Sequence, residues 1–199
     1  MEQAREDRRV RKTKARLRQA LTALMCQKDI KDITVKEITE QADVNRGTFY
    51  CHYQDIYDMI AQTENALFEE LEEVLDAYTT SDLRAGLIPI LEDIFRFVQA
   101  NADFCGALLS SQRDGALFQR LYQVVYSKCL EEWGELYGLC RDPMRDYYMN
   151  FLVSGVVGLV QVWVSQGLRK PPEEMAALAE ALIRSGISSL GQSAERAIK

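Results

Sequence analysis

Apolar residues recur every three or four positions along almost the whole chain, which is the spacing of one face of an α-helix. Val10, Leu17, Leu21 and Leu24 give the first such stripe and predict a helix over roughly 8–27. Few segments alternate as strands do, and the 199 residues include only four prolines. The pattern therefore predicts an all-α protein.

Capping residues mark where the next helices begin. Thr34 and Glu37 are spaced as a capping box, in which each side chain bonds to the other residue's backbone N–H. After a short turn, Asn45 is a suitable N-cap for a short third helix, and Asp55 for a longer fourth one. Two short helices joined by a tight turn, behind a first helix, are typical of a helix-turn-helix.

The polar run at 79–82 (TTSD) is the predicted boundary between two domains. Residues 1–54 form the predicted helix-turn-helix domain, a fourth helix over about 55–78 connects, and residues 79–199 form a second helical domain. Within that second domain, the apolar runs predict helices at about 82–100, 102–111, 115–139, 142–166 and 172–190.

Charge is divided unevenly between these parts. Residues 1–54 carry 12 Lys and Arg against 8 Asp and Glu, a net +4, whereas the rest carries 12 against 22, a net −10. A basic head on an acidic body suggests a polyanionic partner at one end only. The alternative is a solvated charged surface with no partner.

The third predicted helix carries side chains suited to DNA, because the second helix of a helix-turn-helix enters the major groove. Arg46 can reach guanine or phosphate, Tyr50 offers a flat face and a hydroxyl, and His52, the only histidine, offers an N–H or a positive charge to the backbone. Phe49 lies on the opposite face and should be core. The alternative is a small surface helix whose histidine is merely exposed.

The stretch from about Arg11 to Leu71, through TVKEITEQADVNRGTFYCHYQDIYDMI, resembles the tetracycline-repressor (TetR) family of transcriptional regulators. The resemblance implies an N-terminal helix-turn-helix domain for DNA and a C-terminal helical domain for effector binding and dimerisation. The DNA-binding residues expected on this basis, with Asn45 as the cap of the recognition helix, are Thr34, Lys36, Asn45, Arg46, Gly47, Thr48, Tyr50, Cys51 and His52.

Two positions depart from the family's usual pattern. Ile56 stands where the family often has a lysine that meets a phosphate, so one cation is expected to be missing from the DNA face. Cys51 stands where a large aromatic or polar residue is common, and its small thiol should contact little.

The last two predicted helices carry features of a subunit interface. The final helix has a continuous apolar stripe, and small residues on the preceding helix allow another helix to approach closely. The resemblance implies a four-helix bundle between two subunits, and the alternative is that both helices pack within one monomer. The expected interface residues are Ser154, Gly155, Gly158, Leu178, Leu182, Ile183 and Ile187.

An aromatic stripe along the middle helices is more often core than binding site, but a regulator of this family needs an effector cavity, and apolar walls with a few polar groups suit one. The expected occupant is a small apolar or aromatic effector. The residues expected to line its pocket are Phe95, Arg96, Gln99, Phe104, Arg120, Tyr126, Trp133, Tyr148 and Gln161.

Catalysis is not expected, because the sequence shows no nucleophile–base pair, Gly-rich phosphate loop or metal cluster. The five cysteines show no C-x-x-C spacing, so no cofactor or metal is expected. The most apolar stretch, residues 151–164, has 14 residues, whereas a membrane span needs about 20, so a buried helix in a cytoplasmic protein with no membrane partner is predicted.

The function predicted from the sequence is a DNA-binding transcriptional regulator. Its expected form is a ligand-responsive repressor that binds a pseudo-palindromic operator as a homodimer. One alternative is a regulator of the same fold without an effector, and another is a helical enzyme or binding module.

Overall fold

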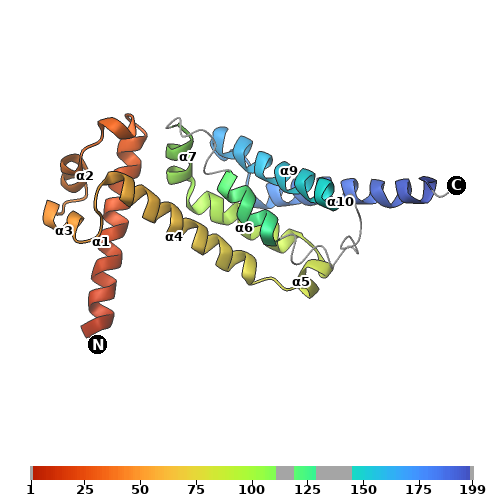
Figure 1. The fold of residues 1–199 in the computed structure, drawn as a ribbon, viewed down its shortest axis with the longest axis horizontal. Helices are drawn as coiled ribbons and strands as arrows, with labels where there is room; N and C mark the ends of the chain where they lie inside the picture. The colour runs from red at the N-terminus through yellow and green to blue at the C-terminus, as the bar shows by residue number, and fades with distance from the viewer. Residues whose placement is uncertain (1, 111–118, 129–144, 198–199) are drawn as a thin grey trace. The chain divides into compact units, whose positions relative to one another are not determined.

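The computed structural model describes residues 2–110, 119–128 and 145–197, and every regular element within them is helical (Figure 1). The predicted all-α class is confirmed. The chain divides into two compact units. The N-terminal unit comprises residues 1–69 with 103–114, and the C-terminal unit comprises residues 70–102 with 115–199.

The N-terminal unit contains the predicted helix-turn-helix. Its core is made of side chains that are fully buried, among them Leu17, Leu21, Ile38, Phe49 and Met59. Its elements are α1 (Glu2–Met25), a 3-10 turn (Ile30–Asp32), α2 (Val35–Gln41), α3 (Arg46–Tyr50), the first part of α4 (Ile56–Asp76) and most of α7 (Ala102–Ser110).

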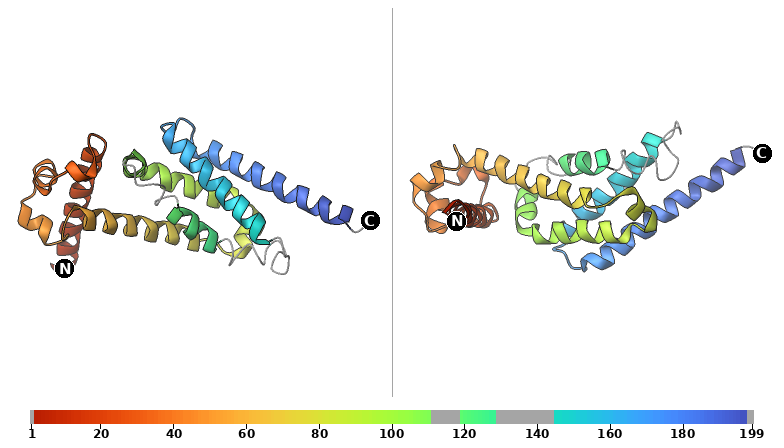
Figure 2. Two further views of the ribbon diagram at one scale, coloured as in Figure 1. Left: turned by 45° about the horizontal axis from the view of Figure 1, so that its top comes forward. Right: turned by 90° about the horizontal axis from the view of Figure 1, so that it is seen from below.

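The C-terminal unit is a helical layer built around α6 (Ile88–Ala100), α9 (Arg145–Ser165) and α10 (Pro172–Ala197). Helix α10 packs along α6 and also contacts α9 (Figure 2). The ring of Phe95 meets that of Trp163 edge-on, with the ring centroids 5.3 Å apart. The indole Nε1–H of Trp163 donates to the Lys170 carbonyl oxygen at 2.9 Å, which fixes the turn after α9.

The single helix predicted over 82–100 is wrong, because α5 (Thr80–Ala85) and α6 are separate helices. Thr79 caps α5 in a capping box with Asp82, so the polar run taken as a boundary starts a short helix. Gly86 and Leu87 separate the two helices, and Pro89 in the first turn of α6 has no N–H for a longer helix to use.

Candidate nucleic-acid interface and ligand cavity

The start of α2 is held by the predicted capping box. The backbone N–H of Glu37 donates to Thr34 Oγ1 at 3.3 Å, and that of Thr34 donates to Glu37 Oε2 at 2.9 Å. Lys28 adds a hydrogen bond from Nζ to Glu37 Oε1 at 2.6 Å. The hydrogen bonds from Lys28 and Thr34 lower the pKa of Glu37 to about 2, so the carboxylate keeps this network together until the pH falls far below 4.5.

Thr34→Ala is expected to destabilise the folded state by about 1 kcal/mol, because the N-cap oxygen is lost. Thr34→Ser keeps a hydroxyl at the same place and should retain most of the stability. Urea unfolding at neutral pH measures both variants. An equal loss in Ser and Ala would show that the threonine methyl group, rather than the cap, matters.

Helix α3 is capped as predicted by Asn45, whose Oδ1 accepts from the Thr48 backbone N–H at 2.7 Å and from its hydroxyl at 3.0 Å. A Cβ on Gly47 would lie 3.2 Å from the same Oδ1, so the cap itself favours glycine there. Phe49 faces inward and is fully buried, whereas Tyr50 is 59% exposed. The helix thus has one face in the core and one toward solvent.

The sequence-predicted DNA-binding residues lie together on the surface of α2 and α3. None of them is buried: Thr34, Lys36, Asn45, Arg46, Gly47, Tyr50 and Cys51 are exposed, and Thr48 and His52 are partly exposed. This arrangement permits contact with a groove, and the individual DNA contacts stay predictions.

A long-range ion pair that the sequence did not reveal holds the turn between α2 and α3. Asp43 has a left-handed backbone (φ 52°), which Asp tolerates better than most residues. Its Oδ2 accepts from Arg16 Nη2 of α1 at 2.9 Å. Both side chains are well exposed, so the pair orients the turn more than it stabilises the unit.

Ile56, which stands where the family often has a phosphate-contacting lysine, lies in the core and not on the exposed surface. Its side chain is only 9% exposed and belongs to the core of the N-terminal unit. Asp55 caps α4 by accepting from the Asp58 backbone N–H at 2.8 Å, and the next side chain, Tyr57, is the exposed one. Position 56 therefore contributes packing to the core of the N-terminal unit.

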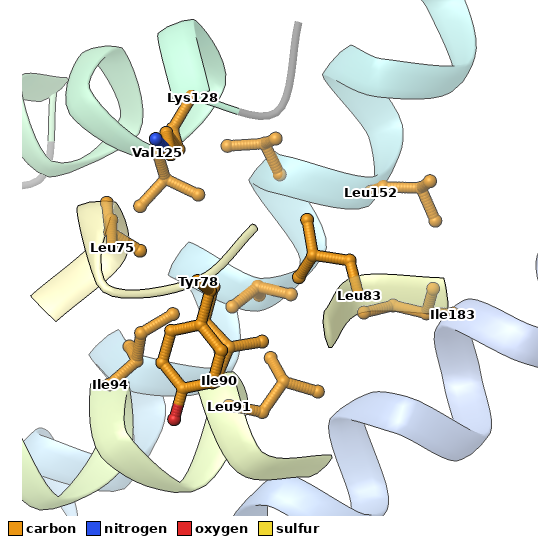
Figure 3. Close-up of a pocket in the computed structure, with 12 residues that line it drawn as sticks. Leu75, Tyr78, Leu83, Ile90, Leu91, Ile94, Val125, Lys128, Leu152 and Ile183 are labelled. Carbon is orange, nitrogen blue, oxygen red and sulfur yellow. The ribbon is translucent and has the colours of Figure 1, made fainter. Parts of the chain in front are cut away.

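The C-terminal unit encloses an apolar cavity (Figure 3). Its volume is about 30 Å³, so the apolar walls nearly close on one another. Among the lining residues that the structure describes, Lys128 is the only charged one. The lining consists of Leu75, Tyr78, Leu83, Ile90, Leu91, Ile94, Val125, Lys128, Leu152, Val153, Val156 and Ile183.

The two polar side chains of the lining are both tied to acids. The Tyr78 hydroxyl donates to Asp93 Oδ2 at 2.6 Å, and burial together with this hydrogen bond raises the pKa of Tyr78 to about 12. Lys128 Nζ donates to Asp76 Oδ1 at 2.8 Å. Tyr78 thus stays neutral, and Lys128 brings the single charge.

The cavity is lined by a different set of residues from the one expected. Phe95 fills the core against Trp163, and Arg96 pairs on the surface with Glu92 and Glu173. Phe95 and Trp163 therefore belong to the core, and most of the described cavity walls are aliphatic. None of the other expected residues is among those that line the cavity. Gln99 and Gln161 are exposed, and Arg120, Tyr126 and Tyr148 are partly exposed. Phe104 lies in the N-terminal unit, and Trp133 lies outside the described residues.

Helix α9 has an uncovered apolar face. Tyr147, Phe151 and Val162 are 70%, 73% and 53% exposed at helical spacing, with Ser154 and Gly155 exposed between them. The helix is long and apolar enough to cross a membrane by length and composition alone, and 33% of that span is buried. The predicted buried helix is therefore buried on one face only.

Five of the seven expected interface residues are exposed or partly exposed: Ser154, Gly155 and Gly158 on α9, and Leu178 and Leu182 on α10. On α10, Leu178 and Leu182 are 46% and 55% exposed. Apart from neighbouring residues and backbone of the same helix, no atom lies within 4 Å of where a Cβ on Gly155 or on the partly exposed Gly158 would stand, so no packing contact in the described chain requires these glycines.

One interface residue was predicted wrongly. Ile183 is 3% exposed and lines the cavity, so it packs within its own unit and cannot face a second subunit. The Ile187 side chain lies outside the described ones.

Comparison with known proteins settles the family. Residues 87–185 match the family model of a TetR-type transcriptional regulator C-terminal region. The chain belongs to the TetR family of transcriptional regulators. An uncharacterised HTH-type transcriptional regulator of Bacillus subtilis (strain 168), YxbF, is 25% identical to this TetR-family chain over 169 residues. That match covers 81% of the chain and only 42% of the relative.

Solved structures show the same fold. A TetR transcriptional regulator from Streptococcus agalactiae 2603V aligns with a TM-score of 0.61 at 23% identity, covering 89% of this chain and 97% of its own. The transcriptional regulator FadR from Bacillus subtilis, in complex with stearoyl-CoA, aligns with a TM-score of 0.62 at 14% identity, covering 86% and 98%.

Proposed function

We propose that this TetR-family chain is a cytoplasmic, ligand-responsive repressor that binds a pseudo-palindromic DNA operator as a homodimer. The observation that carries the proposal is the capped helix α3, whose Phe49 is buried while Arg46 and Tyr50 face solvent. Such a helix can enter the major groove and contact base edges.

A dimer is supported by the apolar face of α9 and α10. Exposed Phe151, Val162 and Leu182 form a surface that a soluble monomer rarely leaves uncovered. Two copies joined by a two-fold axis would cover it and would present two α3 helices to a pseudo-palindrome. Burial of α9 in such a dimer would also explain its apolar composition, with no need for a membrane.

An effector is supported by the apolar cavity in the C-terminal unit. The structurally similar FadR from Bacillus subtilis was solved with stearoyl-CoA, which is a ligand with a long apolar chain. A ligand that binds the DNA-free form more tightly than the DNA-bound form would release the repressor.

The decisive experiment is a mobility shift with the DNA upstream of the chain's own gene. Specific binding is expected, with the slope of log affinity against log salt at roughly −5 to −7, as six to eight neutralised phosphates on a dimer site would give. Binding with a slope near zero, or no preference over random DNA of equal length, would contradict the proposal. A scrambled sequence of the same composition is the control.

A further inference from the structure

We infer that the cavity binds an apolar chain ending in a single carboxylate, and that this carboxylate replaces Asp76 as a hydrogen-bond partner of Lys128. The inference rests on the proposed function only in taking the cavity as an effector site. It goes further by naming the chemical class of the ligand and the contact that the ligand breaks.

The lining of the cavity indicates a ligand with a flexible apolar chain. The described residues of its walls are aliphatic apart from Tyr78 and Lys128, and the Tyr78 hydroxyl is already bonded to Asp93 (Figure 3). Most of the unfilled space is too narrow for a water molecule, so a bound ligand must push the walls apart. A flexible chain does this more easily than a rigid ring system, because it can follow the gaps between Leu, Ile and Val side chains.

Lys128 lies where the polar end of such a ligand would be. A second, more open groove is lined by Glu72, Leu75, Asp76, Gln123, Val124, Ser127 and Lys128. The cavity and this groove share Leu75 and Lys128. Lys128 therefore lies where the apolar space meets a more open groove with polar residues in its lining, which is where an amphiphile places its head group.

Charge selects a single carboxylate as the head group. The Lys128 side chain is 21% exposed, and Asp76, its partner at 2.8 Å, is 70% exposed. Exchange of one carboxylate for another keeps the lysine paired and lets Asp76 turn to water. A neutral head cannot displace Asp76, and a polyanion such as coenzyme A would meet the carboxylates of both Glu72 and Asp76.

The exchange also gives the ligand a route to the DNA-binding unit. Asp76 is the last residue of α4, a helix that begins in the N-terminal unit. The Lys128–Asp76 pair ties the end of α4 to the helical segment 119–128. A carboxylate ligand removes that tie, so it changes how the end of α4 is held.

The test is calorimetric titration of the full chain with four ten-carbon probes: decanoate, 1-decanol, decyltrimethylammonium and decanoyl-CoA. Decanoate is expected to bind about tenfold tighter than decanol, the size of one charge-assisted hydrogen bond. Lys128→Met should remove that difference, and Asp76→Asn should tighten decanoate several-fold. Glu174→Gln, which breaks the surface pair with Lys170, is the matched control and should change neither.

Equal binding of decanoate and decanol, tighter binding of the cation or of decanoyl-CoA, or no binding of any probe would overturn the inference. Thermal melts check that Lys128→Met folds. If Lys128→Met does not fold, the affinity of Asp76→Asn for decanoate tests the inference alone. A mobility shift without any probe tests the proposed function separately. DNA binding without decanoate binding would leave the regulator intact and the ligand class wrong.

Discussion

Phe49→Ala is expected to destabilise the N-terminal unit by about 3–5 kcal/mol, the usual cost of removing a fully buried phenylalanine. Its ring is 0% exposed and meets Tyr50 edge-on and Tyr53 at a tilt, with ring centroids 5.4 and 5.5 Å away. The loss is a large fraction of the stability of a small domain. Urea unfolding should show it, and DNA binding should vanish with the fold.

The adjacent variant Tyr50→Ala separates folding from DNA contact. Tyr50 is 59% exposed, so its removal should cost about 1 kcal/mol or less and leave the unit folded. Operator affinity should nevertheless fall about tenfold or more, as for the loss of one good base or phosphate contact. If Tyr50→Ala bound the operator as tightly as the wild type, α3 would not be the recognition helix.

The parts of the fold that could be predicted from the sequence depend on neighbours in the chain. The caps at Thr34, Asn45 and Asp55 each bond to the residue three positions later, so the residue types and their spacing suffice. The burial of Phe49 follows in the same way from the period of a helix.

The errors arose where a distant part of the chain decides the outcome. Ile183 continues an apolar stripe of α10 that is partly buried and partly exposed, and periodicity does not show which residue faces which neighbour. The Lys128–Asp76 pair joins residues 52 positions apart, and Arg16 reaches Asp43 over 27 positions. Neither pair has a local pattern that would reveal it.

Phe151→Glu is expected to weaken the proposed dimer by about 3 kcal/mol or more. The Phe151 side chain is 73% exposed on α9. A two-fold axis would place one new negative charge from each subunit in the interface. Repulsion between these charges would then destabilise the dimer in addition to the loss of apolar contact. Sedimentation should show monomers, and operator affinity should fall with the loss of one half-site. Ile88→Glu, at a 38% exposed apolar residue of α6, is the matched control and should stay dimeric.

Gly155→Leu tests the same face without adding charge. A Cβ at this position would meet no atom within 4 Å, so the isolated chain has room for the side chain, and leucine favours a helix more than glycine does. The monomer should therefore be as stable as the wild type or more so. The partner helix, if it packs closely at Gly155, would be held away at a cost of about 1–3 kcal/mol. A more stable chain that dimerises less is the expected result, and an unchanged dimer at nanomolar concentration would place the interface away from Gly155.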